Sequence, residues 1–142
     1  MSASESIIVP SSIADAIAKQ ANAELPNEAC GYLAGIDNRV ERGIPMRNVD
    51  ASPEHFSFDP AEQFAALKTA REAGLSLIGT YHSHPETPAR MSEEDIRLAV
   101  DTSMYYAIYS VIEKKLKVFT VDAAKNVSES RVELLDAARN AR

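Results

Sequence analysis

The sequence predicts a single α/β or α+β domain in which three helices pack around a mixed, largely antiparallel β-sheet. With 142 residues, of which 45% are hydrophobic and 25% charged, the chain has the size and composition of one globular domain. Apolar segments of strand length outnumber the helical segments, and short polar turns join some of them as hairpins. We therefore expect one domain over 1–142, with 136–142 as a fraying tail.

The chain begins with a predicted strand and a predicted helix. Residues 6–9 form a short apolar run that suits a strand. Ser12 and Asp15 have the spacing of a capping box, which predicts that a helix begins there. Pro26 follows Leu25 and cannot continue a helix, so we expect the helix to end at this point.

The pattern of residues 29–54 predicts a hairpin followed by a loop. Residues 29–36 are apolar on both faces, as in a buried strand, and residues 37–38 (Asp-Asn) form a turn into a second strand at 40–42. Residues 43–54 are rich in Gly, Pro, Asn and Ser, which predicts a loop or an irregular edge strand. Residues 55–58 alternate as in a short strand.

The second predicted helix has clear start and stop signals. Asp59 is a good N-cap, and Pro60 suits the first helical position. Phe64, Leu67 and either Ala70 or Arg71 lie along one side of this helix and predict its buried face, and Gly74 closes it.

The remaining elements complete the sheet. Residues 75–82 predict a strand, and a third helix is expected to begin at Ser92 and end near Thr102. Two strands at 104–112 and 116–121 are joined by a short polar turn, and 127–135 predicts the last strand.

Composition excludes several classes of function. Lys and Arg number 15 against 21 Asp and Glu, giving a net charge of −6 without a basic stripe, so nucleic acid is not expected as a partner. The N-terminus lacks signal-peptide features and no apolar run approaches about 20 residues, which predicts a cytoplasmic protein that does not bind membranes. Cys30 is the only cysteine, so a metal site would need His and carboxylate ligands.

Four polar residues around one loop predict a metal site. His82 and His84 alternate at the end of an apolar strand, so their side chains point to the same side and can converge on one ion. Ser92 and Asp95 follow at the start of the third helix, where the positive end of the helix dipole favours a carboxylate. One short loop separates the histidines from this helix.

Two imidazoles, one carboxylate and a water molecule are the usual ligands of a hydrolytic zinc site. Zinc can lower the pKa of the bound water to about 7 and polarise a carbonyl group. Glu28, at the mouth of the buried strand over 29–36, is the best-placed carboxylate to act as general base. Ser92 can donate a hydrogen bond to a developing oxyanion.

The full pattern resembles a known family. Glu28, His82, His84, Ser92 and Asp95 match the motif Glu…His-x-His-x(7)-Ser-x-x-Asp of the JAMM (MPN+) zinc metallopeptidases. The resemblance implies an MPN/JAMM-like fold in which the two histidines and Asp95 bind one zinc ion with a water molecule. It also implies that Glu28 is the acid/base and that Ser92 stabilises the tetrahedral intermediate. The family hydrolyses a peptide or isopeptide bond after the C-terminal Gly-Gly of ubiquitin or ubiquitin-like proteins, by metal-activated water.

Two segments, 27–35 and 48–59, resemble the compact bacterial members of this family. These members are associated with ubiquitin-like sulfur-carrier proteins, from whose C-terminus they release an amino acid or a peptide, as in cysteine biosynthesis. The implied partner is therefore such a carrier protein, bound as substrate.

Other interpretations remain open at the level of sequence. A non-catalytic MPN scaffold would bind partners only, and a two-His-one-carboxylate iron oxygenase would use the same three ligands but leave Glu28 and Ser92 without a role. Glu24 is a nearby alternative to Glu28. We expect His55 to be a structural or substrate-groove residue and Cys30 to be a small buried strand residue.

Overall fold

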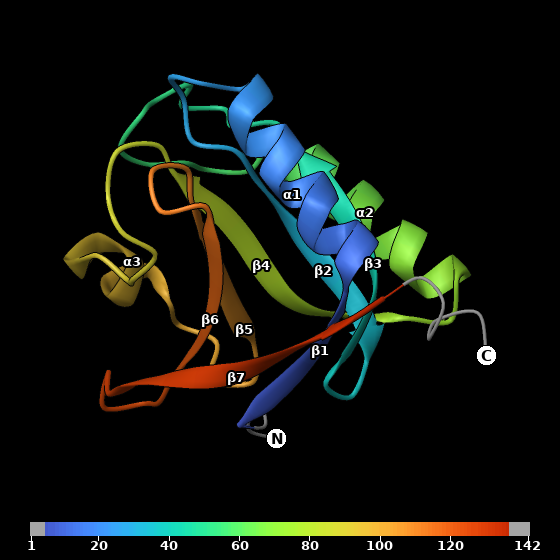
Figure 1. Cartoon of the computed structure of the whole chain (residues 1–142). Helices are drawn as coiled ribbons and strands as arrows, with labels where there is room; N and C mark the ends of the chain where they lie inside the picture. The colour runs from blue at the N-terminus through green and yellow to red at the C-terminus, as the bar shows by residue number, and fades with distance from the viewer. Residues whose placement is uncertain (1–4, 137–142) are drawn as a thin grey trace.

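The computed structural model describes residues 5–136, and seven strands of this part of the chain form a closed barrel (Figure 1). The strands are β1 (Ser6–Pro10), β2 (Cys30–Ile36), β3 (Arg39–Met46), β4 (Ser76–His84), β5 (Tyr105–Ser110), β6 (Lys115–Val121) and β7 (Val127–Leu135). The helices are α1 (Ser11–Ala23), α2 (Pro60–Glu72) and α3 (Glu93–Leu98). Apart from Asp136, the predicted tail over 136–142 lies outside the described residues.

The sheet is mixed, as predicted. Its order is β1-β3-β2-β4-β5-β6-β7, and β7 returns to pair with β1. The pairs β2–β3, β2–β4, β5–β6 and β6–β7 are antiparallel, whereas β4–β5, β1–β7 and β1–β3 are parallel. The closure into a barrel was not predicted, because it depends on pairing the first strand with the last, as in the register of Ser6 with Arg131.

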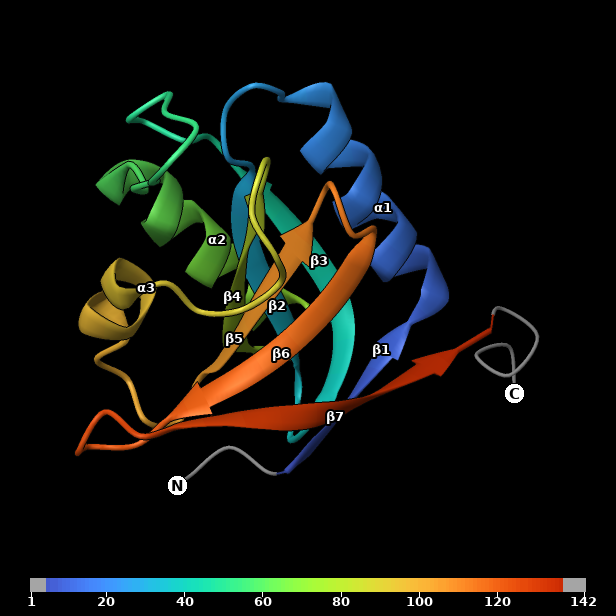
Figure 2. The same cartoon turned by 60° about the vertical axis from the view of Figure 1, so that its left-hand side comes forward.

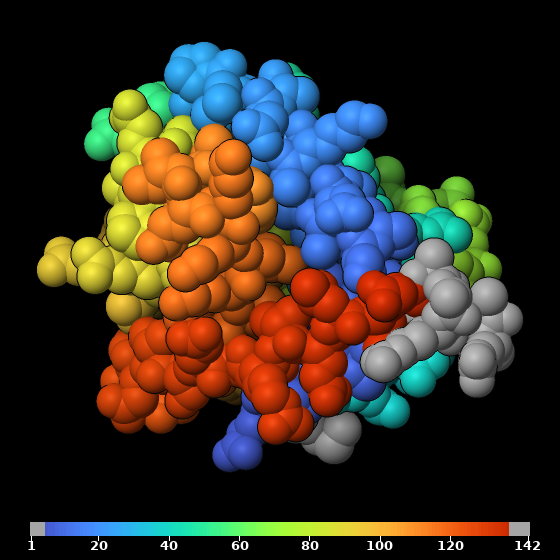
Figure 3. Space-filling view, viewed as in Figure 1, coloured from blue at the N-terminus to red at the C-terminus, as the bar shows by residue number. Residues whose placement is uncertain are grey.

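The helices lie on different sides of the barrel. Helix α1 packs on β1 and β3, and α2 packs on β2 and β4. Helix α3 lies on the side away from α1 in both cartoon views (Figures 1 and 2). Figure 3 shows α1, β6 and β7 forming the surface of one face. Within residues 5–136, no helix is long and apolar enough to cross a membrane.

Three apolar clusters hold α1, α2 and one loop to the sheet. The first lies between α1 and the barrel and includes Leu33 and Tyr81, and the second includes Tyr32 and Ala66 of α2. The third joins Ala89, in the loop between β4 and α3, to Ile108 and Phe119 of the barrel wall. Burial of such side chains contributes about 1.5–3 kcal/mol each for the larger ones. The apolar contacts of Ala89 and Met91 therefore anchor this loop to the barrel.

Two helix predictions were wrong in detail. Helix α1 begins at Ser11, one residue before the predicted Ser12 cap, so Ser12 lies inside the helix and no side chain caps its start. In α2 the Asp59 cap is confirmed, since Asp59 Oδ2 accepts a hydrogen bond from the Glu62 backbone at 3.0 Å. Phe64, however, is 71% exposed. The buried face of α2 consists of small residues, Ala66 and Ala70, which let the helix approach the sheet closely.

Two further predictions were wrong, and the range 43–54, predicted as a loop or an irregular edge strand, contains both a loop and part of a strand. Strand β3 continues through 43–46, where Pro45 is tolerated because β3 pairs with β1 only at Arg39 and has no strand partner on that edge farther along. Residues 55–58 are not a strand, because their backbone bonds to the loop around Asn48 rather than to a ladder. Helix α3 ends at Leu98, before the predicted end near Thr102.

Candidate metal centre

His82 and His84 lie at the C-terminal end of β4, between β2 and β5. Both residues are 5% exposed. The strand alternation places their rings on the same side, and the two Nε2 atoms lie 3.2 Å apart. The prediction that the two rings converge is thus confirmed, because both residues belong to one strand and point to the same side.

Asp95 reaches the histidines from the start of α3. Ser92 is the N-cap, and a capping box joins the two residues: Asp95 N–H donates to Ser92 Oγ at 3.0 Å, and Ser92 N–H donates to Asp95 Oδ2 at 2.9 Å. The cap fixes the Asp95 side chain. Its Oδ1 lies 3.2 Å from His82 Nε2, and its Oδ2 lies 3.1 Å from His84 Nε2.

The geometry of His82, His84 and Asp95 fits a zinc ion. The two Nε2 atoms lie 3.2 Å apart, close to the spacing of about 3.3 Å between neighbouring ligands of a tetrahedral ion with bonds of about 2.0–2.1 Å. Each Nε2 atom also has one Asp95 carboxylate oxygen within 3.1–3.2 Å, Oδ1 for His82 and Oδ2 for His84. The three residues form a cluster able to hold a metal within the described part of the chain. Neutral imidazoles and a carboxylate are the donor types that zinc binds in catalytic sites.

The protonation of the cluster also suits a cation. His84 Nδ1 lies 2.9 Å from the Pro88 carbonyl oxygen, which only accepts, so Nδ1 carries the hydrogen and Nε2 is the atom that can bind a metal. Burial lowers the pKa of His84, but its hydrogen bonds with Asp95 and Pro88 outweigh burial and raise the pKa overall. A metal ion would replace a proton held between His84 and Asp95.

Asp95 stays ionised in these surroundings. Burial raises the pKa of its carboxyl, but hydrogen bonds with His82 and His84 lower the pKa well below its usual range. The carboxylate therefore supplies a negative charge at the point where the two imidazoles meet.

Glu28 lies beside the cluster and is buried, with 4% exposed. It precedes β2, whose pairing with β4 continues beyond the Cys30–His82 pair. Ala29 N–H donates to Ser83 Oγ at 2.7 Å, and Ser83 N–H donates to the Ala29 carbonyl at 2.9 Å. When this antiparallel register is continued by one residue on each strand, Glu28 comes to lie opposite His84.

The carboxyl of Glu28 is poised to exchange a proton near neutral pH. Burial raises the pKa of Glu28 to about 8, the charge of His84 lowers it in part, and the charge of Asp95 raises it further. A carboxyl group with a pKa near the working pH, next to a cation site, has the properties of a general acid/base.

Asn48 and Phe56 were missed by the sequence analysis. Asn48 is buried and its side-chain amide donates to the Glu28 carbonyl at 3.1 Å, while Glu28 N–H donates to the Ser52 carbonyl at 2.8 Å. The ring of Phe56 stacks on His82, with centroids 4.7 Å apart and planes at 29°. Both residues lie in an irregular loop whose contacts depend on the tertiary fold, so no local pattern identified them.

The alternative residues lie elsewhere. His55 Nδ1 contacts Asp50 Oδ2 at 3.0 Å in a side chain that is 49% exposed. Glu24 accepts a hydrogen bond from Gln20 at the end of α1. Cys30 is buried in β2, and burial raises the pKa of its thiol to about 12, which keeps it in the unreactive neutral form.

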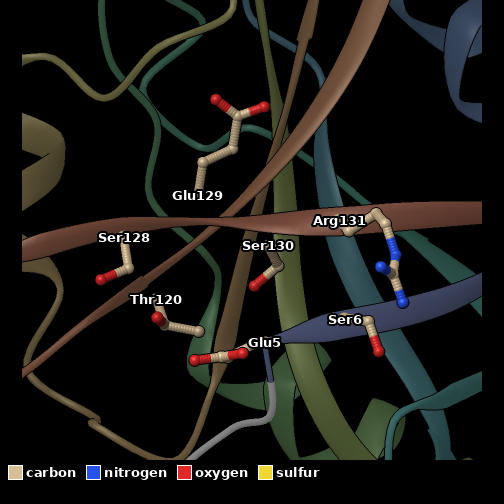
Figure 4. Close-up of a pocket in the computed structure, with 7 residues that line it drawn as sticks. All are labelled: Glu5, Ser6, Thr120, Ser128, Glu129, Ser130 and Arg131. Atoms are coloured by element: carbon tan, nitrogen blue, oxygen red, sulfur yellow. The ribbon is translucent and has the colours of Figure 1, made fainter.

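A separate pocket lies at the other end of the strands (Figure 4). It is lined by seven polar residues from β6, from β7, and from the start of β1 with the residue before it, including Thr120 and Arg131. The register places Thr120 near the end of the barrel where β4 begins, whereas His84 is the last residue of β4. The metal cluster and this pocket are therefore distinct.

The barrel carries a His-His-Asp cluster next to a buried glutamate, and metal-dependent hydrolases use these residue types in their active sites. Residues 10–125 match the family described as prokaryotic homologs of the JAB domain (Prok-JAB). The match covers well over half of the chain, and the chain belongs to this family.

Relatives with stated activities are similar to the chain over much of its length. It is 33% identical over 106 residues to the CysO-cysteine peptidase of Mycobacterium tuberculosis, covering 73% of each chain. It is 46% identical over 77 residues to the probable TtuB-protein conjugate cleaving protease of Thermus thermophilus, covering 54% of this chain and 51% of the relative.

Solved structures share the fold. A protein from Desulfitobacterium hafniense, DSY2949, is 43% identical with a TM-score of 0.84, over 92% of this chain and 93% of that one. A structure described as JAMM, a metalloprotease-like zinc site in the proteasome and signalosome, is 20% identical with a TM-score of 0.60, over 92% and 98%. The second similarity bears on the fold alone, and it confirms the predicted MPN/JAMM-like architecture.

Proposed function

We propose that the protein is a zinc metallopeptidase that cuts after the C-terminal Gly-Gly of a ubiquitin-like sulfur-carrier protein. The observation that carries the proposal is the convergence of His82, His84 and Asp95 on one point beside the buried carboxyl of Glu28. The names of the two relatives, one a CysO-cysteine peptidase and one a protease that cleaves TtuB conjugates, support the same substrate class.

In this proposal, His82, His84 and Asp95 hold one zinc ion. When bound, zinc would supply a Lewis acid that polarises the scissile carbonyl and lowers the pKa of a water molecule. The positive charge of the bound ion would favour the ionised form of Glu28. In that form the Glu28 carboxylate takes the proton from the attacking water and later delivers it to the leaving amine. The low exposure of Glu28 limits competing proton exchange with solvent.

Ser92 can cap α3 and stabilise an oxyanion at the same time. In the capping box its Oγ accepts a hydrogen bond from the Asp95 backbone, which uses a lone pair and not the hydroxyl hydrogen. The hydroxyl hydrogen can therefore be donated to the oxygen that becomes negative in the tetrahedral intermediate.

The experiment combines cleavage with metal content. A ubiquitin-like carrier extended past Gly-Gly is incubated with the wild type, Glu28→Gln and His84→Ala, and the products are identified by mass spectrometry. We expect cleavage after Gly-Gly by the wild type only. Glu28→Gln should retain zinc, because Glu28 is not a ligand, whereas His84→Ala should lose most of it.

The control is His55→Ala, which removes the one histidine outside the cluster and should leave the zinc content unchanged. Turnover by Glu28→Gln at the wild-type rate would refute the role of Glu28. Wild-type protein that contains no zinc and cuts no carrier would favour a scaffold that only binds partners.

A further inference from the structure

The peptide group between Pro88 and Ala89 lies between a proposed metal ligand and a carboxylate. On its carbonyl side, His84 Nδ1 donates to the Pro88 oxygen at 2.9 Å. On its amide side, Ala89 N–H donates to Glu113 Oε1 at 2.8 Å. Both bonds belong to one planar unit, so a chain of hydrogen bonds runs from Glu113 to the imidazole of His84.

We propose that Glu113 is a positioning residue of the metal site, which acts through the Pro88–Ala89 peptide group to hold His84 with Nε2 directed at the metal. The inference rests on the proposed zinc site. Glu113 would be a carboxylate that supports the site without binding the metal, and it lies outside both β4 and α3, which supply the proposed ligands. Glu113 follows β5, 18 positions after Asp95 in the printed sequence.

The surroundings keep this peptide group in place. Ala89 is 2% exposed and packs on the barrel wall. On the preceding peptide, the Thr87 carbonyl accepts from Ser110 Oγ at 2.8 Å, and Ser110 Oγ in turn accepts from the Glu113 backbone at 3.1 Å. The Pro88 oxygen also accepts from the Arg90 backbone at 2.9 Å. The carbonyl therefore has a fixed direction before any metal binds.

Two physical effects follow from the hydrogen-bond chain. A carbonyl that can only accept selects the tautomer of His84 with hydrogen on Nδ1, which leaves the Nε2 lone pair for the metal. A carboxylate on the amide hydrogen polarises the peptide group and strengthens the hydrogen bond at its carbonyl end. Metal-binding histidines commonly depend on such outer partners, whose loss weakens metal binding by about 10–100-fold.

Exposure limits the expected effect. Glu113 is exposed, so solvent screens part of its charge, and it acts through one intervening peptide group. We therefore expect Glu113→Ala to weaken zinc binding by about 10-fold, the lower end of that range. Glu113→Gln retains an oxygen that can accept from Ala89 and should lose about 3-fold, a fraction of the same effect.

The test measures zinc affinity by competition with a chromophoric chelator for the wild type, Glu113→Ala and Glu113→Gln. Glu86→Gln is the control, because it removes the same charge from the loop that contains Pro88 and Ala89, at a side chain that makes no hydrogen bond within residues 5–136. Thermal unfolding of each metal-free protein shows whether the fold is intact. The visible spectrum of the cobalt-loaded proteins reports the ligand geometry directly, and we expect it to change in Glu113→Ala but not in Glu86→Gln.

An affinity of both Glu113 variants within twofold of the wild type, with unchanged cobalt spectra, would overturn the inference. So would an equal loss in Glu86→Gln, because the effect would then be one of general charge. If Glu113→Ala does not fold, the intermediate affinity expected of Glu113→Gln decides the question. Wild-type protein that binds neither metal would refute the proposed zinc site itself, a result distinct from failure of the Glu113 inference.

Discussion

Replacing Glu28 by Gln should stabilise the metal-free protein at alkaline pH. The pKa of Glu28 is raised from 4.5 to about 8, mainly because the carboxyl is buried. In the unfolded chain Glu28 loses its proton near pH 4.5, while the folded protein retains it up to about pH 8. The folded state therefore loses stability as the pH rises through this window. A glutamine at this position has no acidic proton to lose, and the buried amide has nearly the same shape as the protonated acid.

The size of the effect follows from the pKa. The difference between 4.5 and about 8 corresponds to about 5 kcal/mol at 1.36 kcal/mol per pKa unit, as an upper bound. For a domain of this size, a gain of about 5 kcal/mol in the free energy of unfolding raises the melting temperature by about 10–20 °C. At pH 4.5 the two proteins should unfold within a few degrees of each other, because Glu28 is then protonated in the folded state.

The assay is thermal unfolding of both proteins from about pH 4.5 to about pH 9, with a chelator present to keep metal away. His84, Asp95, Glu94 and Glu54 interact electrostatically with Glu28 and are present in both proteins. The difference between the two curves therefore reports Glu28 together with its electrostatic coupling to His84. Parallel curves over the whole pH range would refute the reasoning, since they would mean that burial does not disfavour the ionised carboxylate.

Two further predictions concern the scaffold. Lys125→Met removes an ammonium group that donates to the carbonyls of Ile96 at 3.1 Å, Arg97 at 3.3 Å and Ala99 at 2.8 Å. It should lower the free energy of unfolding by about 1 kcal/mol, measured by denaturant titration, and an unchanged midpoint would show that solvent replaces these bonds. Gly35→Ala would drive a methyl group into the Arg39 carbonyl and should lower the free energy of unfolding by more than about 3 kcal/mol. Gly43→Ala, in the facing strand, meets only an ordinary contact and should lower it by less than about 1 kcal/mol. Equal stability of the two Gly variants would contradict the close approach at Gly35.

Local patterns were sufficient to predict that His82, His84 and Asp95 come together as a candidate metal cluster. His82 and His84 share a face because one strand alternates, and Asp95 is fixed by a capping box with Ser92, so spacing along the chain sets most of the geometry. The placement of Glu28 depended on family resemblance and on its position at the end of a strand. The register through Ala29 then supplies the physical reason for its proximity.

Contacts between distant segments could not be predicted in the same way. Phe56 on His82 and Glu113 behind His84 come from loops, whose path depends on the completed barrel. Phe64 was assigned to a buried face by its hydrophobicity, yet the sheet accepts the smaller residues Ala66 and Ala70 there. Hydrophobic pattern alone does not identify which face of a short helix fits closely against a barrel.

The central claim is that His82, His84 and Asp95 bind one zinc ion. Anomalous diffraction at the zinc edge from crystals of the zinc-loaded protein tests it most directly. We predict one strong peak per chain, about 2.0–2.2 Å from Nε2 of each histidine and from a carboxylate oxygen of Asp95. A peak elsewhere on the chain, or none at this cluster under saturating zinc, would contradict the claim.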